Sequence, residues 1–300
     1  MPARQPSVSR PVLTAGPASA PHYGGGAPHA GATFFLVTCE HGGKRVPAAY
    51  RGLFVGREAL LTSHRGHDPG ALIMARDLAT ALHAPLVSST ISRLLVDLNR
   101  SPGHRARFSE ITRPLSPDER AVIHARYYEP YRRRVERTIA NAIRHGARVV
   151  HISSHSFTPV LDGRVRSADV GFLYDPARHG EVQLSARWMA ALEVRDRSLR
   201  LRRNYPYTGR ADGFCTWLRR QYPPESYVGI ELEVNQRYAT SGGPAWAHLR
   251  AEIVAALLHA VGERKSRAPG EAVTEEARRA QETRAAPSVM QRQAAPSSTA

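Results

Sequence analysis

The chain has little cysteine. Only Cys39 and Cys215 occur among its 300 residues, and neither has a second cysteine at CxxC spacing. A disulfide framework and a cysteine zinc knuckle are therefore not indicated, and a reduced cytoplasm is the expected location. Apolar runs of about 20 residues and the apolar core of a secretory signal are also lacking, so no membrane anchor is expected. The sequence has no internal repeat and no phosphate-binding glycine loop of the P-loop or dinucleotide type, which excludes those nucleotide-binding classes.

Large apolar side chains are scarce at both ends of the chain. Residues 1–30 are mostly Pro, Ala, Gly and Ser, and residues 264–300 are mostly Ala, Arg, Glu, Pro and Ser. Because neither segment can bury enough surface to offset the entropy lost on ordering, we interpret both as disordered tails. Residues 31–263 then form one domain, which is large enough for a full core.

Basic residues outnumber acidic ones. The formal net charge is +16, of which residues 1–30 contribute +2 and residues 264–300 contribute +3, so the central domain carries +11. A basic domain suits an anionic partner, either a nucleic acid or a small carboxylate or phosphate. A solvated, arginine-rich surface is the alternative explanation of the same charge.

Two apolar runs each lead to a histidine. The run FLVTC (35–39) predicts a buried strand over 33–39, and Glu40, His41 and two glycines follow it. A second buried strand is predicted over 147–152, and His155 follows. A strand fixes the direction of an imidazole at its end, which suits metal ligation. A capped strand end followed by a Gly-Gly turn is the alternative at His41.

Asp68 lies just before Pro69 and a helix predicted over 71–82. An N-cap is the structural role that this position favours for its carboxylate, because Pro suits the first turn of a helix.

Two stretches place polar side chains on one strand face. If the segment after Ile91 is extended, Arg93, Asp97 and Asn99 share a face, since side chains alternate along a strand. In the strand predicted over 227–235, Glu231 and Glu233 likewise share a face. Two carboxylates on one face repel each other unless a cation or a donor lies near. The alternative is an edge strand that shows its polar face to water in the first case, and a half-exposed strand in the second.

Strands and helices alternate along the domain. The other predicted elements are strands at 85–90 and 170–174 and helices at 117–144, 184–192, 214–221 and 244–261. We interpret the arginines and tyrosines of helix 117–144 as a solvated face with half-buried tyrosines. The alternation predicts an α/β fold with a mainly parallel sheet, in which ligands lie beyond the carboxyl ends of the strands.

Six motifs, in this order, resemble the N-formylglutamate amidohydrolase family, which is related to the zinc carboxypeptidases and aspartoacylases. They are CEHGG (39–43), DPGA (68–71), DLNRS (97–101), HSF (155–157), NYPY (204–207) and ELEVN (231–235). The resemblance runs from about residue 34 to residue 258. It implies a single-domain three-layer sandwich around a mixed, mainly parallel sheet. It also implies a cytoplasmic enzyme, monomeric or homodimeric, that cleaves N-formyl-L-glutamate to formate and L-glutamate in histidine degradation.

The resemblance further implies one Zn²⁺ held by two histidines and a carboxylate. His41 and His155 match the histidine positions of the family. The carboxypeptidases take their carboxylate from His-x-x-Glu, but the residue three after His41 is Lys44. Asp68 is therefore the expected third ligand, with Glu40 as the alternative. Two histidines, one carboxylate and an open position make a hydrolytic zinc site.

The later motifs match catalytic and binding positions of the family. Glu233 matches the glutamate that takes the proton of the attacking water, with Glu231 as the alternative. Arg93 is placed like the arginine that stabilises the oxyanion in the related enzymes. Asn99 and Arg100 match a pair that clamps the substrate carboxylate. Further residues expected in the substrate pocket are Arg203, Tyr207 and Arg210.

Two competing functions fit parts of the sequence. A related metallo-amidase or peptidase, acting on another N-acyl amino acid or on peptidoglycan, would share the zinc ligands, although the lack of an export signal counts against peptidoglycan. A basic nucleic-acid-binding protein would need arginines on one continuous face with stacking aromatics. That function gives no role to the paired histidines, so the expected partner is a small molecule, with neither a nucleic acid nor a membrane involved.

Overall fold

The computed structural model describes residues 31–262, so the two segments interpreted as disordered tails lie outside the described residues. The strands are β1 (Thr33–Cys39), β2 (Leu86–Ser88), β3 (Arg148–Phe157), β4 (Val160–Leu161), β5 (Arg164–Val165), β6 (Val170–Leu173), β7 (Leu201–Arg203) and β8 (Tyr227–Asn235). The helices are η1 (Ala48–Phe54), α1 (Glu58–Thr62), α2 (Ala71–Ala81), α3 (Pro117–Ile123), η2 (His124–Tyr128), α4 (Glu129–Arg144), α5 (His179–Arg195), α6 (Phe214–Arg219), α7 (Gln236–Ser241) and α8 (Gly243–Gly262).

Six strands form one mixed sheet in the order β2-β1-β3-β8-β6-β7. The first four run parallel, whereas β6 pairs antiparallel with β8, and β7 runs parallel to β6. The predicted mixed, mainly parallel sheet is confirmed. Parallel pairing brings the carboxyl ends of β1, β3 and β8 to one edge, which is where the predicted histidines lie.

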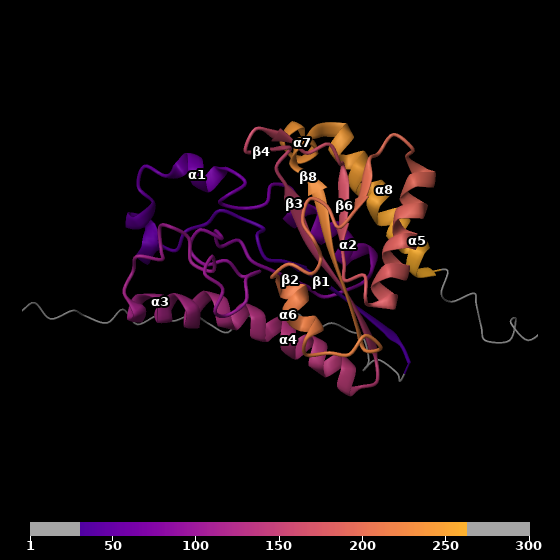
Figure 1. Cartoon of the computed structure of the whole chain (residues 1–300), viewed down its shortest axis with the longest axis horizontal. Coiled ribbons are helices and arrows are strands. Elements are labelled where there is room, and N and C mark those ends of the chain that lie inside the picture. Colours follow the sequence, from indigo (N-terminus) through magenta and orange to yellow (C-terminus); the bar gives the residue numbers. More distant parts are fainter. Residues whose placement is uncertain (1–30, 263–300) are drawn as a thin grey trace, which may run out of the picture.

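Helices cover both faces of the sheet, which gives three layers (Figure 1). Helices α2, α5 and α8 pack on one face, and α4 and α6 pack on the other. In α2 the buried side chains recur at helical spacing from Ala71 through Met74 to Leu78, so a single stripe faces the sheet. Both faces of β8 are buried, so the alternative of a half-exposed strand is wrong.

Gly70, not Asp68, is the N-cap of α2. Its φ of +83° lies in the left-handed region, and a side-chain carbon added there would approach Cβ of Ala239 to 2.5 Å. No side chain caps this helix end. The expectation of a structural cap at Asp68 is therefore wrong, and its carboxylate points elsewhere.

Residues 92–100 form turns rather than the extended segment considered above. The side chains of Ser92 and Asp97 accept hydrogen bonds from the main-chain N–H groups of Leu94 and Asn99, at 3.3 and 3.0 Å. Such local hydrogen bonds compete with strand pairing. The alternation argument for this segment was therefore wrong, although the turns still bring Arg93 and Asp97 together.

Helices α3, η2 and α4 follow one another without a break from Pro117 to Arg144, as predicted. The prediction of a solvated arginine face is wrong for Arg132, which is buried with its guanidinium 3.9 Å from the ring centroid of Phe214. This guanidinium donates to the main-chain oxygens of Leu98 and Arg100, so the helix holds the loop that carries the DLNRS motif.

Between residues 31 and 262, no helix has both the length and the apolar character needed to cross a membrane.

Candidate active site

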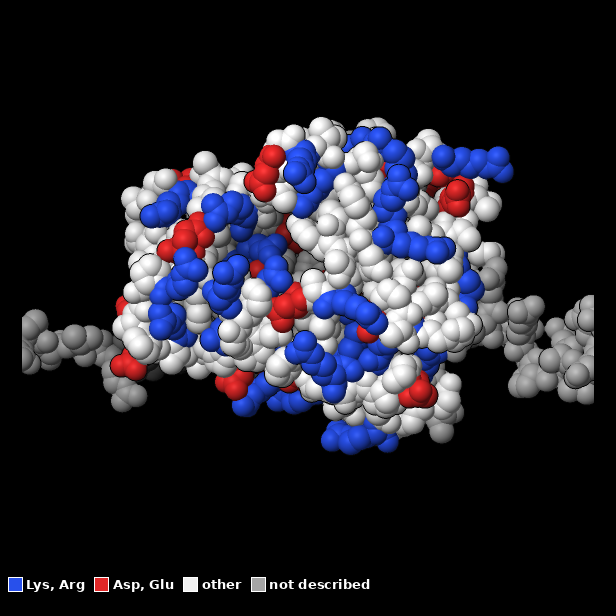
Figure 2. Space-filling model, in the orientation of Figure 1, with Lys and Arg blue, Asp and Glu red and all other residues white. Residues whose placement is uncertain are grey.

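A cavity of about 450 Å³ opens at the carboxyl ends of β1, β3 and β8. Its walls include side chains of the sequence motifs described above, together with the turns around residues 64–68, 93–113 and 207–212. Basic side chains gather around a central hollow on this face of the molecule (Figure 2). The cavity is thus the common meeting point of motifs that are far apart in sequence.

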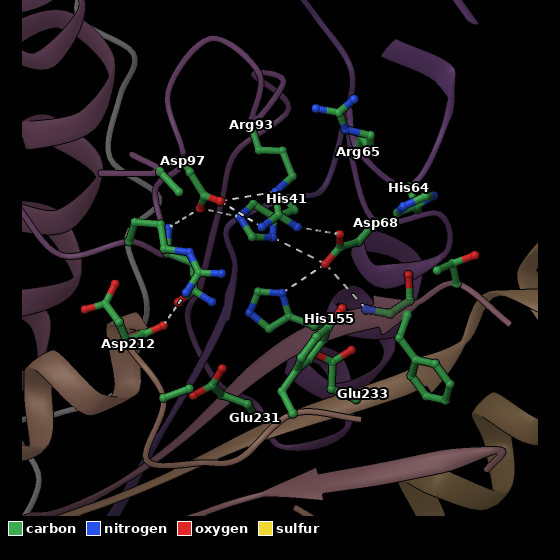
Figure 3. Close-up of a pocket in the computed structure, with 18 of the residues that line it drawn as sticks. His41, His64, Arg65, Asp68, Arg93, Asp97, His155, Asp212, Glu231 and Glu233 are labelled. Carbon is green, nitrogen blue, oxygen red and sulfur yellow. Dashed lines mark hydrogen bonds and ion pairs between the residues drawn. The ribbon is translucent and has the colours of Figure 1, made fainter. Parts of the chain in front are cut away.

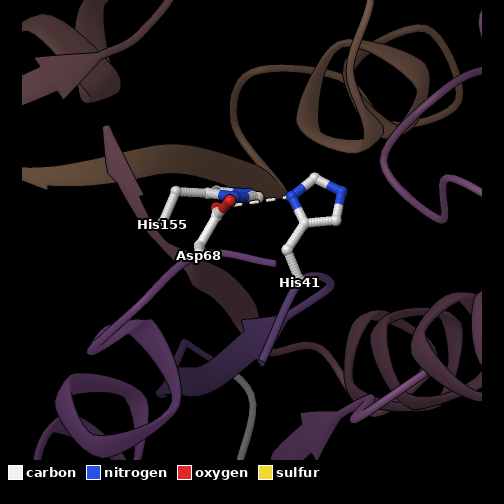
Figure 4. A group of neighbouring side chains, drawn as sticks. All are labelled: His41, Asp68 and His155. Atoms are coloured by element: carbon white, nitrogen blue, oxygen red, sulfur yellow. Dashed lines mark hydrogen bonds and ion pairs between the residues drawn. The ribbon is translucent and has the colours of Figure 1, made fainter. Parts of the chain in front are cut away.

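His41, Asp68 and His155 converge in this cavity with ligand atoms within 4.8 Å of one another (Figure 4). Oδ2 of Asp68 lies 3.3 Å from Nδ1 of His41 and 3.0 Å from Nδ1 of His155. Donors around a tetrahedral zinc, with bonds of about 2.1 Å, lie roughly 3.4 Å apart. The three side chains therefore fit the donor set and the spacing of a zinc ion.

The far side of each imidazole is held by another carboxylate. Nε2 of His41 lies 2.8 Å from Oδ1 of Asp97, and Nε2 of His155 lies 3.2 Å from Oε2 of Glu40. Glu40 is fully buried, and Tyr131 donates a hydrogen bond to it at 2.8 Å. Carboxylates commonly orient metal-binding histidines in this way. Of the two candidates for the third ligand, Asp68 faces both Nδ1 atoms, whereas Glu40 lies behind His155.

The carboxylates of this group are held ionised. Burial alone would raise the pKa of Asp68, but the charge of His41 and hydrogen bonds from both histidines lower it well below its usual range. Burial would likewise raise the pKa of Glu40, and His155 and Ser153 lower it instead. Ionised carboxylates and imidazoles are among the ligands that bind zinc, so the charge state also fits a cation.

Glu233 lies directly beside His155, because the two residues are register partners in β8 and β3. Its side chain is buried, and Oε2 has no hydrogen-bond partner among the described residues. Burial raises the pKa of Glu233 to about 8. A carboxyl group with a pKa near neutrality, next to a candidate metal group, suits proton transfer.

Arg93 binds two carboxylates at the edge of the candidate metal group. Its Nη2 lies 2.7 Å from Oδ2 of Asp97, and its Nη1 lies 3.3 Å from Oδ1 of Asp68. About 25% of its side chain is exposed, and it lines the cavity. The guanidinium is thus fixed in place while part of it still faces the cavity (Figure 3).

Asn99 and Arg100 line the same cavity, and main-chain groups fix both side chains. Oδ1 of Asn99 accepts a hydrogen bond from the N–H of Phe214 at 2.6 Å, which leaves its NH₂ group without a partner in residues 31–262. Nη1 of Arg100 donates to the main-chain oxygen of Asp212 at 2.7 Å. The remaining donors of this pair are free to meet an anionic ligand.

Of the remaining three predicted pocket residues, the structure places one in the cavity wall and two outside it. Tyr207 lines the cavity, and Nη1 of Arg166 donates to its hydroxyl at 3.2 Å. Arg203 ends the edge strand β7 and is exposed, and Arg210 pairs with Asp175 at 2.8 Å. Neither arginine is among the residues that line the cavity. The expectation that both would complete the pocket is not met.

Some contributors were not identified from the sequence. Tyr131 and Ser153 hold Glu40, and Asp212 holds Arg100 through its main-chain oxygen. Hydrogen-bond partners that lie far apart in the sequence and share no motif cannot be recognised from a single sequence. Only Ser153 could have been recognised, because it precedes His155 by two residues and therefore lies on the same face of the strand.

The fold and the cavity together define an α/β protein whose cavity contains a group of side chains that can hold a metal ion. The family model described as N-formylglutamate amidohydrolase matches residues 33–239. The chain therefore belongs to the N-formylglutamate amidohydrolase family, and it is an amidohydrolase. A small-molecule substrate follows from this membership. The prediction of the family and of an enzyme is confirmed.

Two solved structures are similar to this chain. The gene product Atu2144 from Agrobacterium tumefaciens is 30% identical, with a TM-score of 0.67 over 77% of this chain and 92% of that one. The N-formylglutamate amidohydrolase from Ralstonia eutropha JMP134 is 19% identical, with a TM-score of 0.57 over 80% and 97% of the two chains. At that identity the second structure supports the fold alone. No curated protein matches the sequence significantly.

Proposed function

We propose that the protein is a zinc-dependent amidohydrolase that releases a carboxylic acid from an N-acyl amino acid, with N-formyl-L-glutamate as the first candidate substrate. The observation that carries the proposal is the convergence of His41, Asp68 and His155 beside the unpartnered carboxyl of Glu233. A cytoplasmic role in histidine degradation belongs to the same proposal and depends on that substrate.

His41, Asp68 and His155 would hold the zinc ion, and Asp97 and Glu40 would keep the two imidazoles in place. Zinc bound there supplies a Lewis acid that polarises the scissile carbonyl and activates water. Asp68 is favoured over Glu40 as the third ligand because its Oδ2 faces Nδ1 of both histidines.

Glu233 takes the proton of the attacking water and passes it to the nitrogen of the leaving amine. Its burial supports this role, since a base with a pKa close to the working pH transfers protons in both directions. Glu231 is a less suitable base because it lies two residues earlier in β8, where its register partner is Ser153 rather than His155.

Arg93 donates hydrogen bonds to the oxyanion that forms at the scissile carbonyl. Its anchoring by Asp97 and Asp68 supports this, because a preorganised donor does not have to reorient during the reaction. Asn99 and Arg100 bind the carboxylate of the amino acid that is released. Their unpartnered N–H groups support that role.

The proposal is tested by metal analysis of the purified protein followed by an amidase assay. We expect about one zinc per chain, and we expect hydrolysis of an N-acyl amino acid to stop on chelation and return with added zinc. Asp68→Asn should lose both zinc and activity. Glu193→Gln removes one charge from the exposed face of α5 and serves as the control. Full hydrolysis by the chelated, zinc-free protein would refute the metal-dependent mechanism.

A further inference from the structure

Arg132 in α4 is a buried cation that no carboxylate contacts directly. Only 3% of the residue is exposed, and within residues 31–262 its guanidinium forms no ion pair. Burial lowers the pKa of Arg132, although the more distant charges of Glu136, Glu40 and Asp212 oppose this. A buried charge without a carboxylate beside it is costly, so its location calls for an explanation.

Three aromatic rings surround this guanidinium. Its central carbon lies 3.9 Å from the ring centroid of Phe214 and 5.2 Å from those of Tyr128 and Trp217. Nη2 has no hydrogen-bond partner in the described part of the chain, whereas Nη1 makes two hydrogen bonds. Attraction between a cation and aromatic faces stabilises the buried charge and holds it between α4 and α6. The rings therefore keep Nη1 in one place.

The two hydrogen bonds of Nη1 reach the main chain on either side of Asn99. They go to the oxygens of Leu98 and Arg100, at 3.1 and 3.3 Å. The hydroxyl of Tyr128 donates to the same oxygen of Arg100 at 2.7 Å. Residues 98–100 lie in turns, where no strand pairing fixes the backbone. These three hydrogen bonds from η2 and α4 therefore help to fix it.

Arg132 reaches Asn99 by a second route, through Phe214. The ring of Phe214 packs against the guanidinium, and its main-chain N–H donates to Oδ1 of Asn99 at 2.6 Å. Displacing Arg132 would therefore move both Asn99 and Arg100, the residues to which the proposed function assigns the substrate carboxylate.

We propose that Arg132 is a positioning residue that sets the affinity of the carboxylate clamp formed by Asn99 and Arg100. The inference rests on the proposed function, because it takes these two residues as the site of the substrate carboxylate. Arg132 does not line the cavity, so it acts through the main chain rather than by contact with the substrate. A clamp held in its binding geometry loses less entropy when the ligand binds.

The first test replaces Arg132 by Met, which keeps an apolar stem among the rings but removes the charge and both hydrogen bonds. We expect the KM for N-formyl-L-glutamate and the Kd of free L-glutamate to rise about 10- to 100-fold, as one hydrogen bond to a charged group allows. The kcat should stay nearly unchanged, because the clamp acts equally in the ground and transition states. Arg134→Met, at an exposed position of α4, is the control. Parent values of KM and Kd in folded Arg132→Met would overturn the inference.

The second test is milder and remains decisive if Arg132→Met does not fold. Tyr128→Phe removes one hydrogen bond to the oxygen of Arg100, so KM and Kd should rise by about 3- to 10-fold. Tyr127→Phe removes a hydroxyl that makes no hydrogen bond within the described residues and is the control. Thermal melts and zinc content check that each variant is folded and loaded. A parent KM in folded Tyr128→Phe would contradict the inference.

A double variant distinguishes positioning of the clamp from a general loss of order. Arg132→Met added to Arg100→Ala should weaken L-glutamate binding by a smaller factor than in the parent protein, because half of the clamp is already missing. A general structural defect would weaken binding by the same factor in both backgrounds. Equal factors would therefore refute the positioning role.

Turnover separates this inference from the proposed function. If the zinc-loaded parent protein does not cleave N-formyl-L-glutamate but binds L-glutamate, the proposed function fails and the binding ratios still decide the role of Arg132. If it cleaves the compound and the Arg132 and Tyr128 variants keep its KM, the amidohydrolase stands and the inference fails. A parent protein that neither cleaves N-formyl-L-glutamate nor binds L-glutamate refutes both.

Discussion

Nε2 of His41 lies 2.8 Å from Oδ1 of Asp97, while Oδ2 of the same carboxylate accepts hydrogen bonds from Arg93 at 2.7 and 3.2 Å. One carboxylate thus fixes both a candidate zinc ligand and the candidate oxyanion donor. Asp97 is itself held by the turn in which it lies, since its Oδ1 also accepts from the N–H of Asn99. The turn after β2 therefore positions two parts of the site at once.

Replacing Asp97 by Asn should weaken zinc binding. The neutral amide keeps the shape of the side chain but removes the charge that orients His41, and the loss of such a partner typically costs 10–100-fold in metal affinity. The measurement is a zinc competition titration with a chelator. Asp175→Asn, which removes a carboxylate paired outside the cavity, is the matched control. Unchanged zinc affinity would show that Asp97 does not support His41.

Replacing Glu233 by Gln should abolish most activity without removing zinc. An amide of nearly the same volume cannot accept a proton, and proton transfer by one side chain contributes about 10²–10⁴-fold to the rate. We expect a loss of that size in kcat, with the zinc content and the melting temperature close to those of the parent protein. Activity near the parent level would move the role of base to Glu231 or to another group.

Hydrophobic pattern was enough to predict the main strands and helices around the site. The strand over 33–39 and the helix that begins at Ala71 have the predicted bounds within one residue. Both elements bury apolar side chains at the spacing that their secondary structure requires, so the sequence carries the information locally. The prediction for 92–100 failed because Leu94 and Leu95 are both buried within turns, where side chains do not alternate between two faces as they do in a strand.

The site was only partly predictable, for physical reasons. His41, Asp68 and His155 stand out because each follows or interrupts a strong local pattern. The position of Glu40 behind His155 depends on how β1 pairs with β3, which no local pattern encodes. Arg203 and Arg210 belong to a polar segment near the cavity, but composition does not tell which side chains face it.

His151 should make the protein sensitive to acid. Burial lowers the pKa of His151 to about 4, and its two ring nitrogens lie 2.8 and 2.7 Å from hydroxyls of Thr38 and Tyr227. The unfolded chain takes up this proton below about pH 6.5, whereas the folded chain does so only near pH 4. The stability from this residue is therefore complete above pH 6.5 and is lost as the pH falls to 4.

The loss is on the order of 3 kcal/mol of unfolding free energy across that window. Urea unfolding at pH 7, 5.5 and 4.5, with metal removed, measures it in the parent protein and in His151→Gln. We expect the variant to be less stable at pH 7 and to lose less stability on acidification, since the other titrating groups are common to both proteins. Parallel pH profiles would show that His151 is not responsible.

Arg93 and Arg100 should differ in the kinetic constant that they control. A donor to the oxyanion acts only in the transition state, so Arg93→Ala should lower kcat by about 10²–10³-fold. A carboxylate clamp acts equally in the ground and transition states, so Arg100→Ala should raise KM and leave kcat nearly unchanged. Steady-state kinetics on one good N-acyl amino acid substrate separates these outcomes.

Arg100→Lys provides the sharper test of the clamp. The main-chain oxygen of Asp212 fixes one nitrogen of the Arg100 guanidinium, so this planar group presents its other N–H groups in a set direction. An ammonium group has a single nitrogen and cannot bind the oxygen of Asp212 and a carboxylate with the same geometry, so KM should stay high in this variant. Recovery of the parent KM would mean that only the charge matters. An unchanged KM in Arg100→Ala would assign the carboxylate to another cation of the cavity wall, of which Arg65 and Arg113 are the candidates.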